Sequence, residues 1–360
     1  MPVIDADTHV TEGDDAFAYL RDSELQFAPI KGEVPARNGG SPRGYWLVGG
    51  QQMSRRIQRD GDVWKTMGEL LDVDARLRAM DDMGVDTQVI YPTFFNKAVG
   101  SSMGEAALAR SYNRWMADRC GKSGGRLRWV AVPALQSIQS TIEEMRFAKE
   151  HGAVGVLKKG DEEAGYWPAE PYFFPVYEEA ERLDLPMCFH VGSGYTGMMP
   201  LERLAHMTQH KFHLSHVSAF CSLITFQIPD KFPNLRWGFI EVTASWVPYA
   251  LYYMRRILTK SVTTPGVASS VAGSTTYQVP RDVLSRNRMY VSCFVDEDLP
   301  RIIEQTGEDN LLMGSDFVHH DHATELDFVG ALQQRVDRGE LSATFVRKLT
   351  YDNPRTFYGL

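Results

Sequence analysis

Short apolar segments alternate with longer amphipathic segments along most of this chain. The amphipathic segments repeat their apolar positions every three or four residues, which is the period of a helix. The apolar segments are bounded by turn residues, and strands of a parallel sheet have this pattern. The apolar segments cover residues 2–7, 87–93, 128–135, 153–159, 186–192, 235–242, 288–294 and 310–316, and clear helical examples are 73–84, 104–121, 140–152 and 173–186.

Eight predicted strands alternating with helices indicate an α/β fold, a (β/α)₈ TIM barrel. A doubly wound sheet is disfavoured because no GxGxxG motif follows the first strand. Two stretches interrupt the repeat. Residues 13 to about 66 form a long insertion after the first strand, and the glycines and aromatics of 38–53 predict a hairpin. Residues 261–281 are rich in Ser, Thr and Gly and predict a loop, so we expect 1–360 to form one barrel domain.

Composition narrows the class of protein. The 360 residues are 43% apolar with a formal net charge of -8, which argues against nucleic acid or an anionic membrane as partner. No apolar run approaches the roughly 20 residues of a membrane helix, and the early polar DADTH segment is unlike a secretory signal. We expect a cytoplasmic homodimer or higher homo-oligomer with a small-molecule substrate. The four cysteines are far apart, which fits a reducing compartment: Cys120, Cys188, Cys221 and Cys293.

Ionisable residues stand where the predicted strands end. In DADTH the period of a strand would place Asp5, Asp7 and His9 on one face. The remaining strand-end groups are Lys158, Lys159, His190, Glu241 and Asp316. Each alone has an ordinary explanation as a turn or core residue, but a barrel brings all of these ends to one mouth. Crowded charges there would cost several kcal/mol unless a divalent cation compensates them, and mixed imidazole and carboxylate ligands suit Zn, Mn or Fe.

These segments also resemble the amidohydrolase superfamily, in the branch of aminocarboxymuconate-semialdehyde decarboxylase and the resorcylate decarboxylases. The resemblance runs from VIDADTH through FHVGSG and FPNLRWGFIEVTASWVPY to MGSDFVHHD and DNPRTFYGL. It implies a (β/α)₈ barrel with one catalytic divalent metal, with Zn²⁺ favoured and Mn²⁺ or Fe²⁺ as alternatives. The metal ligands that it implies are Asp7, His9, His190 and Asp316.

Two positions depart from the pattern of that family. Glu241 stands where the decarboxylases carry a catalytic histidine on the sixth strand, so His216 of the preceding helix is a candidate to supply the imidazole. Val318 stands where proline is usual, and His319 matches a histidine of the family. We therefore expect Asp316, His216 and Glu241 to be catalytic.

Other residues are candidates for contact with a substrate. Arg55 and Arg56 of the first insertion would hold a carboxylate bidentately, with a solvated basic turn as the alternative. Trp246 would form a pocket wall, with core packing as its alternative, and His319 is included with this group. Lys158 is a secondary candidate, because some relatives use a carbamylated lysine there. Asp5 is expected to hydrogen-bond a ligand.

The function predicted from these features is metal-dependent, non-oxidative decarboxylation of an aromatic or unsaturated carboxylic acid. The alternative is hydrolysis of an amide, lactone or C–C bond by a metal-activated water. A barrel used only for binding is disfavoured, because a scaffold has no need of clustered ionisable groups.

Overall fold

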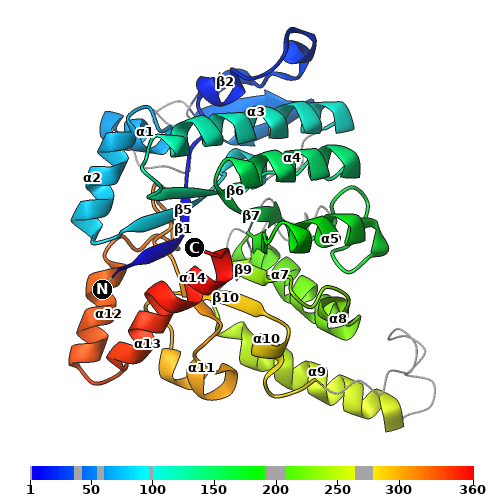
Figure 1. Ribbon diagram of the computed structural model, residues 1–360, viewed down its shortest axis with the longest axis vertical. Helices are drawn as coiled ribbons and strands as arrows, with labels where there is room; N and C mark the ends of the chain where they lie inside the picture. Colours follow the sequence, from blue (N-terminus) through cyan, green and yellow to red (C-terminus); the bar gives the residue numbers. More distant parts are fainter. Residues whose placement is uncertain (1, 36–42, 55–60, 97–99, 192–207, 264–278) are drawn as a thin grey trace.

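Eight parallel strands form a nearly closed barrel in the computed structural model, which describes residues 2–35, 43–54, 61–96, 100–191, 208–263 and 279–360 (Figure 1). Strands adjacent in the sheet are also consecutive among the barrel strands. The barrel strands are β1 (Ile4–His9), β5 (Thr87–Tyr91), β6 (Leu127–Ala131), β7 (Ala153–Lys158), β8 (Met187–His190), β9 (Trp237–Ile240), β10 (Met289–Cys293) and β11 (Leu311–Met313). The predicted barrel is confirmed, and each predicted strand overlaps one of these.

Helices surround the barrel (Figure 1), and local signals set their ends. In α2 (Val73–Met83) the Asp72 side chain accepts a hydrogen bond from the Ala75 amide at 3.0 Å, and Gly84 ends the helix with a left-handed φ of 71°. The other helices are α1 (Asp62–Gly68), α3 (Ser102–Gly121), α4 (Ile138–Glu150), α5 (Phe174–Arg182), α7 (Thr208–Thr225), α8 (Ile228–Lys231), α9 (Trp246–Thr263), α10 (Val283–Arg286), α11 (Leu299–Thr306), α12 (Phe328–Asp337), α13 (Ala343–Arg347) and α14 (Asn353–Tyr358). None in the described part of the chain is long and apolar enough to cross a membrane.

The C-terminal helix α14 fills the end of the barrel where the strands begin. The Tyr358 hydroxyl donates to the Ala6 carbonyl at 2.6 Å and lies 2.7 Å from the Tyr91 hydroxyl. The Phe357 ring lies against Gly238, where an added Cβ would come within 2.2 Å of the ring. Because this end is packed, the carboxyl ends of the strands are where a site can open.

The insertion after β1 contains a small antiparallel sheet (Figure 1). Its strands are β2 (Ile30–Val34), β3 (Arg43–Val48) and β4 (Gln51–Ser54), in the order β2-β3-β4. Gly49 and Gly50 join β3 to β4 with φ of 54° and 81°, the positive values that a tight hairpin turn needs. The predicted hairpin is confirmed. In the second insertion α9 continues to Thr263, and 264–278 lie outside the described residues.

Glu179 joins α4 to α5. Its carboxylate accepts hydrogen bonds from Arg146 Nε at 2.7 Å and from Arg182 Nε and Nη2 at 2.9 and 2.6 Å. The bonds from Arg182, helped by those from Arg146, lower the pKa of Glu179 to about 2, although burial opposes them. The two arginine side chains are more than half exposed, at 53% and 59%, so water weakens the attraction.

We expect Glu179→Gln to lower the free energy of unfolding at pH 7 by about 1–2 kcal/mol. The folded pKa lies below the unfolded value near 4.5, so this stabilisation is complete above pH 4.5 and is lost as the pH falls toward 2. Urea titrations at pH 7, 5 and 3.5 measure it, with exposed Glu178→Gln as the control. An equal loss at pH 7 and 3.5 would contradict the prediction.

Candidate active site

Strands β1 and β11 bring the first and last predicted ligands together. The Asp316 amide donates to the Asp7 carbonyl and the His9 amide to the Phe317 carbonyl, both at 2.9 Å. The register between β1 and β5 shifts between Asp5 and Thr8, so the simple alternation predicted for β1 is broken. Asp7 and His9 therefore enter the same cluster while Asp5 does not.

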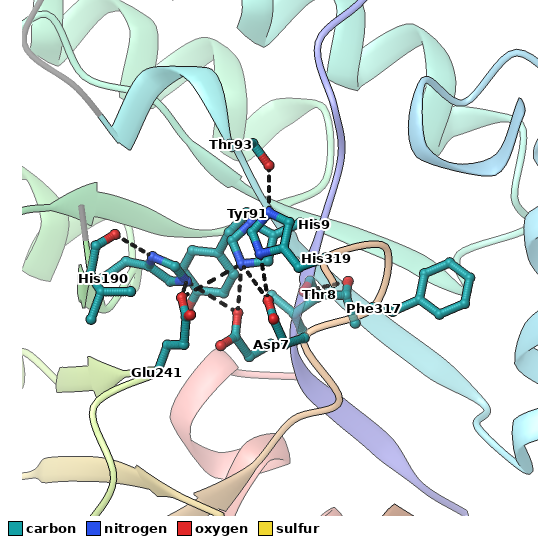
Figure 2. Close-up of polar contacts among 12 residues, drawn as sticks. Asp7, Thr8, His9, Tyr91, Thr93, His190, Glu241, Phe317 and His319 are labelled. Atoms are coloured by element: carbon teal, nitrogen blue, oxygen red, sulfur yellow. Dashed lines mark hydrogen bonds and ion pairs between the residues drawn. The ribbon is translucent and has the colours of Figure 1, made fainter. Parts of the chain in front are cut away.

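Side chains from four strand ends meet at the mouth. Figure 2 shows Asp7, His9, His190 and Glu241 there, and Asp316 lies beside His9. His9 Nε2 lies 3.5 Å from Asp7 Oδ1, 3.3 Å from Asp316 Oδ1 and 4.0 Å from Glu241 Oε2. His190 Nε2 lies 3.3 Å from both Asp7 Oδ1 and Glu241 Oε2. Every predicted metal ligand belongs to this cluster, and so does Glu241.

The backbone fixes which nitrogen each of these imidazoles presents. His9 Nδ1 lies 3.3 Å from the Pro92 carbonyl and His190 Nδ1 lies 2.9 Å from the Val191 carbonyl. A carbonyl only accepts, so each Nδ1 carries a proton and Nε2 is the ring atom that each imidazole turns toward the carboxylates. Burial, with the nearby His319 and His190 adding to it, holds the pKa of His9 well below its ordinary value, so His9 is neutral. A lone pair of His9 therefore faces carboxylate oxygens.

A divalent ion fits this arrangement. Four ligand atoms around an ion at bond lengths of about 2.0–2.2 Å lie roughly 3.3–3.6 Å apart in tetrahedral geometry. The three distances from His9 to Asp7, from His9 to Asp316 and from His190 to Asp7 are 3.5, 3.3 and 3.3 Å, in this range. The ligand atoms of Asp7, His9, His190 and Glu241 all lie within 4.8 Å of one another, and Asp316 joins this group through His9 and Glu241. His9 Nε2 and Asp316 Oδ1 are buried and make no hydrogen bond among the described residues. The donor set is one that Zn²⁺, Mn²⁺ or Fe²⁺ accepts.

Burial raises the pKa of the acidic groups that surround this position. Burial and the charges of Asp316 and Asp7 hold the pKa of Glu241 well above its ordinary value. Burial also raises the pKa of Asp316, although His319 beside it opposes the change. Without a cation these carboxyl groups are therefore held toward the protonated form, and they are able to carry a proton.

The backbone is strained at two of these carboxylates. Glu241 and Asp316 have φ of 59° and 53°, in the left-handed region that residues other than glycine seldom adopt. Such a conformation costs on the order of 1–3 kcal/mol and persists only where the surrounding structure imposes it. Glu241 directly follows β9 and Asp316 lies three residues after the end of β11, so the turn after each strand aims its carboxylate into the mouth.

His319 completes the cluster. Its ring stacks on that of His9 at 3.8 Å between centroids, and its Nδ1 lies 2.7 Å from Asp316 Oδ1. Burial acts to lower the pKa of His319, but the Asp316 carboxylate outweighs burial and raises it. Exposed Asp321 also has an oxygen within 4.8 Å of the ligand atoms of Glu241, Asp316 and His319.

Residues that the sequence did not single out support this cluster. Arg76 of α2 is fully buried, and it donates to the His9 carbonyl at 2.8 Å and to Gln88 Oε1 at 2.7 Å.

Asp5, expected to hydrogen-bond a ligand, accepts instead from the Ser315 amide and hydroxyl at 2.8 and 2.6 Å. That expectation was wrong because of the register shift in β1. Asp5 now holds the residue that precedes Asp316.

Comparison with known proteins identifies the family. The amidohydrolase family matches residues 4–360. The chain belongs to the amidohydrolase family. Gamma-resorcylate decarboxylase of Rhizobium sp. (strain MTP-10005) is 30% identical over 141 residues, and that of Rhodococcus jostii (strain RHA1) is 31% identical over 144. These alignments cover 36% of this chain and only 42% and 43% of the relatives.

Solved structures share the fold of this amidohydrolase. An amidohydrolase from Mycobacterium avium subsp. paratuberculosis K-10 superposes with a TM-score of 0.76 at 18% identity, over 100% of this chain and 98% of that one. A 5-carboxyvanillate decarboxylase from Novosphingobium aromaticivorans DSM 12444 superposes with a TM-score of 0.70 at 18% identity, over 100% and 96%. The latter structure holds manganese and 4-hydroxy-3-methoxy-5-nitrobenzoic acid.

Val318, in the loop after β11, stands where the resemblance to the family implied proline, and the backbone of this amidohydrolase explains the difference. Val318 has a φ of 78°, and the ring of proline fixes φ near -65°. Proline therefore cannot occupy position 318 in this backbone. The same turn brings His319 back beside Asp316, while His320 and His322 are exposed.

The remaining predicted residues lie elsewhere. His216 is buried in α7 with its Nδ1 3.3 Å from the Ser215 hydroxyl, and it is outside the ligand groups found among the described residues. Trp246 packs on Phe220 and Phe239 and donates to the Val242 carbonyl at 3.0 Å, which fits the core-packing alternative. Catalysis by His216 and substrate contact by Trp246 stay predictions.

Three cationic side chains were also candidates for the site. Lys158 is fully buried, pairs with Glu163 and lies 4.3 Å from the Phe173 ring centroid, so its ammonium is engaged outside the ligand cluster. Arg55 and Arg56 lie outside the described residues.

We expect the protein to bind one divalent ion per chain, and His190→Ala to weaken that binding by roughly 100-fold or more, since even outer-shell changes cost 10–100-fold. Titration of metal-free protein with Zn²⁺ and with Mn²⁺, followed by elemental analysis, measures both numbers. The exposed His320→Ala is the matched control and should bind as the unaltered protein does. Equal metal content in the His190→Ala and His320→Ala proteins would contradict the site.

Proposed function

We propose that this protein is a metal-dependent, non-oxidative decarboxylase of an aromatic or unsaturated carboxylic acid. The observation that carries the proposal is the pair of Nε2 atoms from His9 and His190 that face buried carboxylates. The amidohydrolase family and the partial likeness to gamma-resorcylate decarboxylases support the choice of reaction.

Asp7, His9, His190 and Asp316 are the ligands that we propose for the metal. When bound, the ion supplies positive charge that holds a substrate carboxylate and a neighbouring oxygen and withdraws electrons from them. Zn²⁺ is our first choice because two imidazoles and carboxylates suit it, and Mn²⁺ is the second because a structural relative holds it.

The chain's own residues then have to deliver one proton. In decarboxylation the bond between the substrate carbon and the carboxylate breaks, its electron pair stays on that carbon, and a proton takes the place of the CO₂ that leaves. Glu241 is the proton carrier that we favour, because its carboxyl group is buried and its pKa is raised. Asp316 and His216 remain the alternatives that the sequence named.

Hydrolysis is the rival reaction for the same site, and the fate of water separates the two. We expect turnover in D₂O to place deuterium on the carbon that loses CO₂, and turnover in ¹⁸O-water to leave the organic product unlabelled. Mass spectrometry of the product formed from a panel of hydroxybenzoic acids measures both labels. Incorporation of ¹⁸O into the organic product would instead establish a hydrolase.

The role of Glu241 has its own test. Glu241→Gln keeps the shape of the side chain but cannot release a proton, so we expect turnover to fall by about 10²-fold or more. The variant should still hold one metal ion per chain. Asp321→Asn, an exposed carboxylate at the rim of the same cluster, is the control, and it should keep most of the activity. Loss of the metal from Glu241→Gln would make Glu241 a ligand and contradict its assignment as the proton carrier.

A further inference from the structure

The segment that follows β5 contacts two of the clustered imidazoles. Its Pro92 carbonyl binds His9, and its Thr93 hydroxyl lies 2.8 Å from His319 Nε2 (Figure 2). The same hydroxyl donates to the Val10 carbonyl at 2.7 Å. None of the contacts assigned to the metal ligands so far involves Thr93.

The hydroxyl of Thr93 has one proton, and Val10 receives it. Val10 is fully buried, and its carbonyl receives no other hydrogen bond from the described part of the chain. Buried carbonyls rarely stay unpaired, so the hydroxyl proton belongs to this bond. Thr93 Oγ1 is then an acceptor toward His319, and His319 Nε2 carries the proton between them.

This bond decides which atom His319 turns toward the metal site. With Nε2 protonated and bound to Thr93, Nδ1 is the atom 2.7 Å from Asp316 Oδ1. Stacking on His9, with 21° between the ring planes, limits tilting of the ring. His319 is therefore fixed at both nitrogens and on one face.

Glu12 fixes Thr93 in turn. Its carboxylate is 3% exposed and accepts hydrogen bonds from the Thr93 amide at 3.1 Å and the Phe94 amide at 2.8 Å. A carboxylate that accepts two successive backbone amides holds that segment in one conformation. The chain from Glu12 through Thr93 to His319 thus ends at Asp316.

We propose that Thr93 is a positioning residue that accepts a hydrogen bond from His319 Nε2 and thereby holds His319 Nδ1 against Asp316, one of the ligands proposed for the metal. Glu12 is the anchor that makes this possible. The proposal rests on the metal site proposed above, but it does not depend on which reaction the enzyme catalyses.

Two variants of nearly equal size test the hydroxyl. Thr93→Val replaces it with a methyl group, and Thr93→Ser retains it. In protein labelled with ¹⁵N-histidine, a long-range ¹H–¹⁵N spectrum reports the protonated nitrogen of each ring, and His319→Gln assigns the signal. We expect Thr93→Ser to keep the protonated Nε2 signal of His319 and Thr93→Val to lose it or mix the two tautomers.

Competition with a chelator should show Zn²⁺ affinity about 10-fold weaker in Thr93→Val and within about 3-fold of the unaltered protein in Thr93→Ser.

Each other outcome has a definite meaning. An unaltered His319 spectrum or Zn²⁺ affinity in Thr93→Val would overturn the proposal, and so would equal changes in both variants, since packing would then be the cause. If Thr93→Val does not fold, Glu12→Gln replaces it, because Glu12 accepts the two amides on different oxygens and Gln has an NH₂ group in place of one of them. An unaltered His319 signal there would overturn the proposal too. Protein that binds no metal would refute the proposed function, while the ¹⁵N spectrum would still decide the role of Thr93.

Discussion

The site depends on two backbone carbonyls that determine how two histidines are protonated. The Pro92 carbonyl accepts a hydrogen bond from His9 Nδ1, and the Val191 carbonyl accepts one from His190 Nδ1. Each buried imidazole therefore turns its Nε2 toward carboxylates. Two lone-pair acceptors at 3.3 Å repel one another unless a proton or a cation lies between them. The cluster is therefore built for positive charge before any substrate is considered, and the chemistry proposed for it follows from that requirement.

The barrel supplies the rigidity that this arrangement needs. Backbone hydrogen bonds join β1 directly to the segment after β11, so Asp7 and Asp316 are held across a few ångströms although 309 residues separate them in sequence. Arg76 binds the carbonyl of His9, Asp5 binds Ser315, and α14 packs the opposite end of the barrel. Because these bonds are buried, the positive φ values at Glu241 and Asp316 are sustained by the fold and need no glycine.

Periodicity in the sequence predicted the strands well because a parallel barrel buries nearly continuous apolar runs, each ending in a polar group. The same argument predicted that Asp7, His9, His190 and Asp316 converge, and His9 lies within 3.5 Å of Asp7 and Asp316 while His190 lies 3.3 Å from Asp7. It failed for Asp5 because a register shift inside β1 leaves no trace in an alternating pattern. It missed Arg76, which reads as a charged residue of an amphipathic helix, and Glu12 and Thr93, whose roles depend on the path of a loop rather than on any spacing.

Glu241 stands where the resemblance to the decarboxylases implied a histidine, and its carboxylate changes the charge of the site. Three carboxylates from Asp7, Glu241 and Asp316 around a divalent ion leave one negative charge, because His9 and His190 are neutral donors. A substrate carboxylate would add another and be repelled. In the metal-free protein burial and the neighbouring carboxylates raise the pKa of Glu241, and a proton kept on Glu241 when the substrate binds would remove that repulsion. In the proposed reaction this proton is the one delivered to carbon, so a carboxyl group at this position would both balance the charge of the bound substrate and carry the proton that the reaction consumes.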